Sequence, residues 1–281
     1  MNEFLPSRYV EIIHRLALGI EPIDSHYRRR LSYDIQLRHD AENFNLPRPP
    51  IDVHVTNNRA SNLFSLRYQP GVTTPIDLRA FDLDITRRRY DPKYDRRRIV
   101  PRRFRIPILT LADVEAQEQI DRLQFRRRIR RPVFFPGAAY DAGLTATALR
   151  GRVLRNGRPM RWARVVARLA GQPLVLGRAH GDDRGEFLLL LNSNAAIGST
   201  LPIPLNIDVA VSGPTVVPVP NPANQEELDP LWDLPLEQLS APGAADPVAA
   251  GETLPAGYGA TTTQTITFTL GRSIYREFVI P

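Results

Sequence analysis

"GRVLRNGRPMRWARVVARL", residues 151–169, and "GDDRGEFLLLL", residues 181–191, decide the fold class of this chain. Asn156-Gly157 is the residue pair that fits a two-residue hairpin turn with positive φ angles. In the second stretch, an Asp side chain can accept hydrogen bonds from the turn backbone, while Gly185 takes a conformation that other residues resist. The strand after the first turn has a period of two, typical of a half-buried strand, with one face formed by Ala163, Val165, Ala167 and Leu169. The first stretch predicts a hairpin and the second a turn followed by another strand, as in a β-sandwich.

The same period of two recurs from residue 8 to 108. The opening stretch 8–18 fits a strand better than a short helix, although its pattern allows both. Within 76–85 the apolar residues occupy even-numbered positions up to Ala80 and odd-numbered positions from Phe81, and such a change of face indicates a bulge. Turn-rich stretches such as "NLPRPP" and "QPGVTTP" separate the other strands. Five or six alternating strands predict an antiparallel sandwich over residues 1–109, with strands at 31–37, 51–55, 64–68, 76–85 and 104–108.

Residues 110–131 break this pattern and predict one connecting helix. The stretch 110–129 has neither proline nor glycine, and Thr110 with Asp113 forms a plausible capping pair. Alternation then returns, with later strands expected at 205–211 and 263–270. Between them, residues 214–258 contain nine prolines and predict an extended segment on a surface or partly disordered. The expected fold class is therefore all-β: two antiparallel sandwiches, 1–109 and 132–281, joined by one helix.

Composition limits the possible functions. With 281 residues, the chain can form two domains that each bury a core, and the absence of cysteine excludes disulfides and thiolate sites. Its start lacks a basic region followed by an uninterrupted apolar core, and no apolar run approaches the roughly 20 residues of a membrane-spanning helix. We expect a soluble, cytoplasmic protein without a signal peptide, and at most indirect membrane contact.

Charge is distributed unevenly along the chain. The net charge is +7, and Lys93 is the only lysine among 37 basic residues. Arginine suits interfaces, but a G+C-rich genome also favours arginine codons, so both explanations stay open. Residues 86–131 contain 16 basic and six acidic side chains, whereas residues 214–258 contain seven acidic and no basic ones. This asymmetry favours pairing of basic with acidic segments, within one subunit or between subunits.

Two groups of residues are candidates for partner binding. The arginine clusters could bind phosphates, but few aromatic residues accompany them, so a protein interface is favoured over a solvated face and over nucleic acid. In "DPLWDLPLE", residues 229–237, Trp232 would anchor a docking segment, unless the segment folds back onto its own chain. The candidate residues are Arg87, Arg88, Arg89, Arg96, Arg97, Arg98, Arg102, Arg103, Arg126, Arg127, Arg128, Leu231, Trp232, Leu234 and Leu236.

No motif indicates catalysis. The five histidines are scattered, and the stretch "HGDDRGEF" from His180 fits a hairpin turn better than a metal site. Asp82 and Asp84 lie on one side of a strand, as acids on a solvated face do, and no phosphate-binding loop or nucleophile elbow occurs. We therefore expect no catalytic residues, no metal site and no cofactor.

The two decisive stretches resemble the carboxypeptidase regulatory-like, or transthyretin-like, domain family. The positions that carry this resemblance are Gly151, Val153, Gly157, Pro159, Ala163, Val165, Asp182, Gly185 and Phe187. The resemblance implies a non-catalytic Greek-key sandwich over about 45 residues.

A wider resemblance includes "VPRRFRIPI", "RRPVFFPGAAY" and "DPLWDLPLE", and is to accessory proteins of phage-tail-like contractile injection systems. It implies a structural subunit at the baseplate or another particle end, with baseplate, sheath or tube proteins as partners and self-association as a further option. A free-standing module that binds carbohydrate, an anionic surface or nucleic acid is the alternative.

Overall fold

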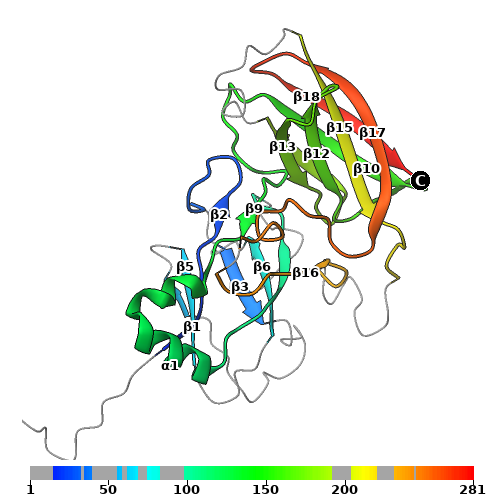
Figure 1. Ribbon diagram of the computed structural model, residues 1–281. Coiled ribbons are helices and arrows are strands. Elements are labelled where there is room, and N and C mark those ends of the chain that lie inside the picture. Colours follow the sequence, from blue (N-terminus) through cyan, green and yellow to red (C-terminus); the bar gives the residue numbers. More distant parts are fainter. Residues whose placement is uncertain are drawn as a thin grey trace, which may run out of the picture.

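The computed structural model describes residues 15–32, 35–39, 56–58, 62–68, 75–82, 98–191, 204–219, 231–243 and 245–281. These residues form an all-β structure, as the sequence predicts, with two sandwiches stacked end to end (Figure 1). In the described ranges the helical elements are α1 (Leu111–Ile120) and a following 3₁₀-helix (Arg122–Arg128).

Two four-stranded sheets and one two-stranded sheet form the N-terminal sandwich. The apolar faces of the two larger sheets share one core, in which Leu18, Phe64, Leu78 and Phe104 are buried. The first sheet has the order β4 (Thr56–Asn58), β5 (Leu63–Arg67), β1 (Leu16–Ile20), β8 (Ile129–Arg130). The second has the order β16 (Leu236–Gln238), β7 (Arg102–Ile106), β6 (Ile76–Asp82), β3 (Ile35–His39). The small sheet pairs β2 (Ile23–Asp24) with β9 (Val133–Phe134).

Strands from beyond the helix complete this sandwich. The strand β8 pairs in parallel with β1, β9 with β2, and β16 with β7. The core also contains Leu239 and Ala249 from the acidic segment, residues 214–258. We expected purely antiparallel sheets, but these sheets also contain parallel pairs. Parallel strands need a long connection, and strands from the later part of the chain have one.

The early strand predictions differ in detail from the structure. Strands at 64–68, 76–85 and 104–108 are confirmed as β5, β6 and β7, whereas residues 8–14, 51–55 and 83–85 lie outside the described residues. The pairing of β6 with β3 is regular through Asp82, so no bulge follows Ala80 in the described part of the strand.

The connecting helix is shorter than predicted. Its capping box is confirmed, because the Thr110 hydroxyl accepts from the Asp113 backbone N–H at 3.1 Å and the Asp113 carboxylate accepts from that of Thr110. The α-helix ends at Asp121, whose backbone is extended and whose carboxylate accepts from the backbone N–H of Leu123 at 2.9 Å. This local hydrogen bond begins the 3₁₀-helix, which explains why the continuous helix over 110–131 was wrong.

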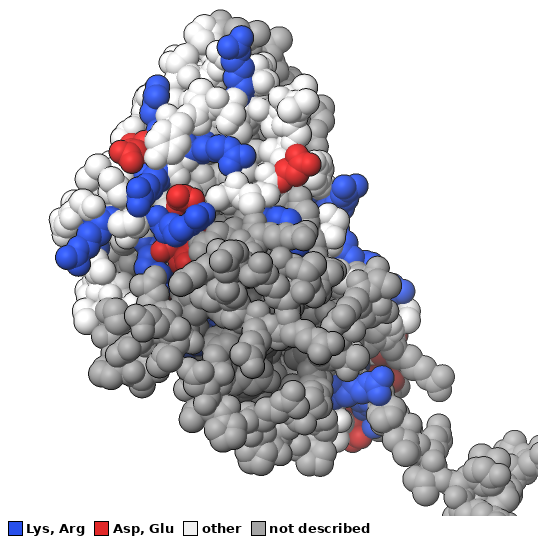
Figure 2. Space-filling model, turned by 180° about the vertical axis from the view of Figure 1, so that it is seen from behind, with Lys and Arg blue, Asp and Glu red and all other residues white. Residues whose placement is uncertain are grey.

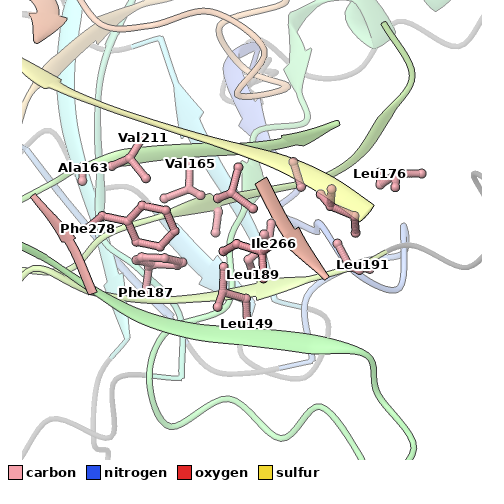
Figure 3. Packing of buried hydrophobic residues seen from close by; sticks show 14 of the residues in the cluster. Leu149, Ala163, Val165, Leu176, Phe187, Leu189, Leu191, Val211, Ile266 and Phe278 are labelled. Carbon is pink, nitrogen blue, oxygen red and sulfur yellow. The ribbon is translucent and has the colours of Figure 1, made fainter. Parts of the chain in front are cut away.

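Two sheets also form the C-terminal sandwich. The first contains β10 (Ala148–Arg155), which lies between β14 (Glu186–Leu190) and β18 (Ser273–Ile280), with β11 (Arg158–Pro159) paired to its end. The second has the order β13 (Val175–His180), β12 (Arg164–Leu169), β15 (Leu205–Pro214), β17 (Tyr258–Phe268). Figure 3 shows Phe187 and Phe278 packed together between the sheets, with their ring centroids 5.8 Å apart.

Both turns form as the sequence predicts, but only the first joins paired strands, because β13 and β14 lie in different sheets. Asn156 and Gly157 have φ angles of 50° and 72° between β10 and β11. In the second turn, which connects β13 to β14, the carboxylate of Asp182 accepts from the backbone N–H groups of Arg184 and Glu186 at 2.8 and 2.9 Å. Gly185 has a φ of 72°, and a Cβ atom there would lie 2.7 Å from the carbonyl oxygen of Val153. The decisive stretches thus set the turns of this sandwich.

Candidate functional site: a groove at the junction of the sandwiches

Arg102 lies at the junction of the two sandwiches and is fully buried. The period of two explains its position, because it shares a face of β7 with Phe104 and Ile106. Its Nε and Nη2 donate to the two carboxylate oxygens of Glu237 at 3.0 and 2.6 Å. The remaining N–H groups donate to carbonyl oxygens at 2.6, 2.9 and 2.6 Å, those of Val133, Ala249 and Val248. All five guanidinium donors are therefore paired.

Glu237 connects the two sandwiches through a second arginine. Arg164, from β12, donates from Nη2 to Oε1 of Glu237 at 3.2 Å. Burial alone would raise the pKa of Glu237, but the charges and hydrogen bonds of Arg102 and Arg164 outweigh it and lower the pKa. An ionised carboxylate with two guanidinium partners therefore links β16, β7 and β12.

His180 lies beside this network at the end of β13. Its ring stacks on Phe135, with centroids 3.9 Å apart. Burial, and then the charges of Arg164 and Arg102, lower the pKa of His180 well below 6.5. The imidazole is therefore neutral and acts in packing. Among the residues that the structure describes, no group of three or more His, Cys, Asp or Glu could hold a metal ion.

Trp162 is strained at the edge of the junction. Its φ is 61°, a left-handed conformation that costs a bulky residue on the order of 1–2 kcal/mol. Several hydrogen bonds hold it there: its backbone N–H donates to the carbonyl oxygen of Asp182 at 3.1 Å, and its Nε1 donates to Asp233 at 2.8 Å. Its own carbonyl oxygen accepts from the hydroxyl of Tyr258 at 2.8 Å. These contacts turn the indole toward the 231–236 segment.

Asp233 fixes that segment against the C-terminal sandwich. Its carboxylate accepts two hydrogen bonds from Arg161, both of 2.7 Å, besides the one from Trp162. The guanidinium of Arg161 also lies 5.9 Å from the ring centroid of Trp232. Leu231 and Leu234 are buried against Trp162, together with Val100. The segment is therefore held by one charged clamp and one apolar cluster.

A groove of about 650 Å³ opens beside Trp162. Its walls come from residues 158–162, 214–218, 232–235 and 256–258. Val216 and Val217, on one wall, are 77% and 51% exposed. Tyr258 forms part of another wall, and burial raises its pKa to about 12, helped by the charges of Glu237 and Asp233 and opposed by that of Arg164. We call this feature the Trp162 groove. Its largely apolar walls and neutral hydroxyl suit an apolar or extended peptide ligand.

The predicted partner-binding residues lie in different environments. Arg87, Arg88, Arg89, Arg96 and Arg97 lie outside the described residues. Arg102 and Arg128 are buried inside the chain, where Arg102 pairs with Glu237 and Arg128 with Glu118. Of the remaining candidates, Arg98 and Arg103 are half-buried, whereas Arg126 and Arg127 are exposed. Only part of the basic set thus lies on the described surface.

Residues 231–237 of the "DPLWDLPLE" segment fold back onto their own chain in this structure. Leu231 and Leu234 are 4% and 2% exposed, and Leu236 begins β16. Their burial follows from the apolar surface that Val100 and Trp162 offer them. Trp232 is half-buried and lines the Trp162 groove. The sequence left open whether this segment docks on a partner or packs within the chain. Leu231 and Leu234 pack within the chain.

Arginines on the C-terminal sandwich have a mixed pattern of charge. Figure 2 shows arginine side chains spread over the back of this sandwich, with Asp and Glu among them. The ladder pairs Arg152 with Glu186 on one side and Glu277 on the other. This described face therefore has both signs of charge, as ordinary solvated surfaces do.

Sequence reasoning missed the residues that build the site: Arg161, Trp162, Arg164, Asp233, Glu237 and Tyr258. A usable signal existed for the pairing of Arg102 with Glu237. Arg102 lies two residues before Phe104, so it shares the inward face of that strand with the apolar core residues. A buried arginine needs a carboxylate partner. The acidic segment was the one stretch rich in carboxylates without arginines of its own.

In the part of the chain that the structure describes, no helix is long and apolar enough to cross a membrane.

Comparisons with known proteins assign no family. No protein-family model and no curated protein matches the sequence. A similar solved structure is the 9R-lipoxygenase from Cyanothece PCC8801, at 12% sequence identity and a TM-score of 0.26. The similarity covers 49% of this chain and 17% of the lipoxygenase chain. At that TM-score, the likeness assigns neither a fold family nor an activity to this chain.

Proposed function

We propose that this protein is a non-enzymatic structural subunit that acts by protein–protein docking. The assembly is a contractile injection system or a related phage-tail-like particle, with the subunit at the baseplate or another end, as the resemblance of the sequence implies. The observation that supports docking best is the Trp162 groove, which combines apolar walls, exposed valines and a fixed aromatic residue.

The partner for this groove is an extended apolar segment of a neighbouring subunit. Val216 and Val217 offer apolar surface that water now covers, so burying them on docking is favourable. Trp232 lines the groove, with its ring centroid 5.9 Å from the guanidinium of Arg161, and tryptophan and arginine are typical of residues that dominate interface energy.

The walls of the groove are held rigidly, which lowers the entropic cost of docking. One wall, around Trp162, belongs to the C-terminal sandwich. Another, 232–235, is continuous with β16, which pairs with β7 of the N-terminal sandwich. The Arg102–Glu237–Arg164 network joins the two. The 232–235 wall is thus held by the C-terminal sandwich on one side and by β16 on the other.

Native purification tests this proposal. The protein is isolated from its own cells at about 0.15 M and then about 0.5 M salt, and co-purifying proteins are identified by mass spectrometry and negative-stain imaging. We expect tube, sheath or baseplate subunits that persist at the higher salt, because contacts that rest only on exposed charge are screened there.

Matched variants locate the contact. Val217→Asp places a charge on the groove wall, and we expect it to abolish co-purification of the partners. Leu144→Asp is the control, because Leu144 is fully exposed in a loop near the opposite end of the C-terminal sandwich. Equal loss in both variants, or partners retained by Val217→Asp, would contradict docking in the groove. A bare monomer from native cells would favour the free-standing binding module instead.

A further inference from the structure

The strand β17 (Tyr258–Phe268) forms one edge of the C-terminal sandwich, as Figure 1 shows. It pairs with β15 along its whole length, from Leu205 opposite Phe268 to Pro214 opposite Tyr258. Among the described residues, none forms a backbone hydrogen bond with the other side of β17 between residues 259 and 268. A row of backbone donors and acceptors therefore faces outward.

Residues 260–268 of this edge have no charge, proline or bulge, the features that usually prevent edge strands from pairing. Its sequence, "YGATTTQTITF", has eleven residues without charge or proline, in a chain in which 24% of residues are charged. The register shift of its ladder lies at the Tyr258 end, so residues 260–268 pair regularly. Soluble proteins commonly protect edge strands with charges, prolines or bulges. The edge strand of the facing sheet, β18, does have exposed charges, at Arg276 and Glu277.

We propose that β17 pairs antiparallel with β17 of a second copy of this chain, about a twofold axis at Thr263. In this register Thr261 lies opposite Thr265 of the second copy, and Thr262 lies opposite Gln264. Threonine pairs across antiparallel strands are stabilising, and no like charges meet. The two four-stranded sheets of the copies then form one continuous sheet.

A second copy matches this edge better than a charged partner does. The net charge of +7 repels two copies over most of their surfaces, whereas β17 offers eleven uncharged positions. A twofold contact also uses the same patch on both subunits, so one self-complementary strand is sufficient. Thr261, Thr263, Thr265 and Thr267 are exposed along this strand, where the Thr265 and Thr267 hydroxyls donate to Asp208 and Asn206 of the neighbouring strand β15. This inference is independent of the Trp162 groove and of the docking partner.

Sedimentation equilibrium of the purified full chain tests the pairing, with Thr263→Lys and Thr263→Glu as variants. Residue 263 meets its own copy on the axis, so each variant places like charges together, and we expect self-association to weaken by at least about tenfold. An equimolar mixture of the two variants places opposite charges on the axis, so the dimer should return. Val279→Lys, at an exposed position of β18, is the control and should dimerise like the unmodified chain.

Three results would overturn the proposal: an unmodified chain that stays monomeric over the accessible concentrations, a dimer that neither variant weakens, or a mixture that does not restore it. Circular dichroism and the thermal midpoint establish that each variant is folded. Because no partner subunit is present, failure here leaves the docking function untouched, and loss of docking in Val217→Asp leaves this dimer untouched.

Discussion

Replacing Glu237 by glutamine removes the one negative charge between two buried guanidinium groups. Removing one partner of a buried ion pair typically costs about 3–5 kcal/mol, because the other charge is left uncompensated. In this structure Arg102 keeps three backbone carbonyl acceptors, and glutamine keeps one side-chain oxygen. We therefore expect the free energy of unfolding to fall by about 3 kcal/mol, the lower end of that range.

Urea unfolding followed by tryptophan fluorescence measures this change. The chain has two tryptophans, and both lie at the Trp162 groove, so the signal reports on the junction. The matched control is Asp77→Asn, which breaks the pair of Asp77 with Arg105 on the same strand, β7, at 2.7 and 2.8 Å. That arginine side chain is 41% exposed, and the expected cost is at most about 1 kcal/mol.

A Glu237→Gln variant that unfolds at the same urea concentration as Asp77→Asn would refute this reasoning. Equal costs would mean that burial of the Arg102–Glu237 pair adds nothing beyond a surface pair.

Three more changes test other parts of the fold. The pKa of His180 is below that of the unfolded chain, so only the unfolded chain gains a proton as the pH falls below about 6.5. Stability should then fall by up to about 1.4 kcal/mol per pH unit, and His180→Gln should flatten this slope in urea titrations at several pH values. Gly157→Ala should cost about 1–2 kcal/mol for its positive φ, and Gly185→Ala clearly more, since its Cβ would also clash with the backbone; equal thermal shifts would contradict this. Leu234→Ala should cost about 2–5 kcal/mol by calorimetry, and an unchanged midpoint would exclude packing within the chain.

The sequence was most informative where a turn needs a particular residue. Asn156-Gly157 predicted a hairpin, and Asp182 with Gly185 predicted the turn between β13 and β14, because few other residues adopt those backbone angles or accept those hydrogen bonds. Alternation likewise predicted the inward face of β12. The other face of a half-buried strand is normally solvated, yet Arg164 on that face is 4% exposed, because Glu237, 73 residues later in the sequence, pairs with it.

The candidate site could not be predicted from local pattern. Glu237 lies 135 residues from Arg102 in the sequence, and nothing in either neighbourhood specifies the other. Asp121 likewise is an ordinary residue within a helical pattern, and its hydrogen bond to Leu123 decides where the α-helix ends. Both features depend on whether a polar group bonds to a neighbour in the sequence or to a distant residue. Hydrophobic periodicity and helix propensity give no information about that competition.

The insertion of β16 into the N-terminal sheet also has a consequence for synthesis of the chain. When the ribosome has made the first 131 residues, Arg102 still lacks its partner Glu237, and β7 still lacks its neighbouring strand β16. The first sandwich must therefore wait for residues 236–249, by which time most of the second sandwich has been made. Folding of the two halves is thereby coupled, and a fragment that ends at the helix should expose its β7 edge and aggregate.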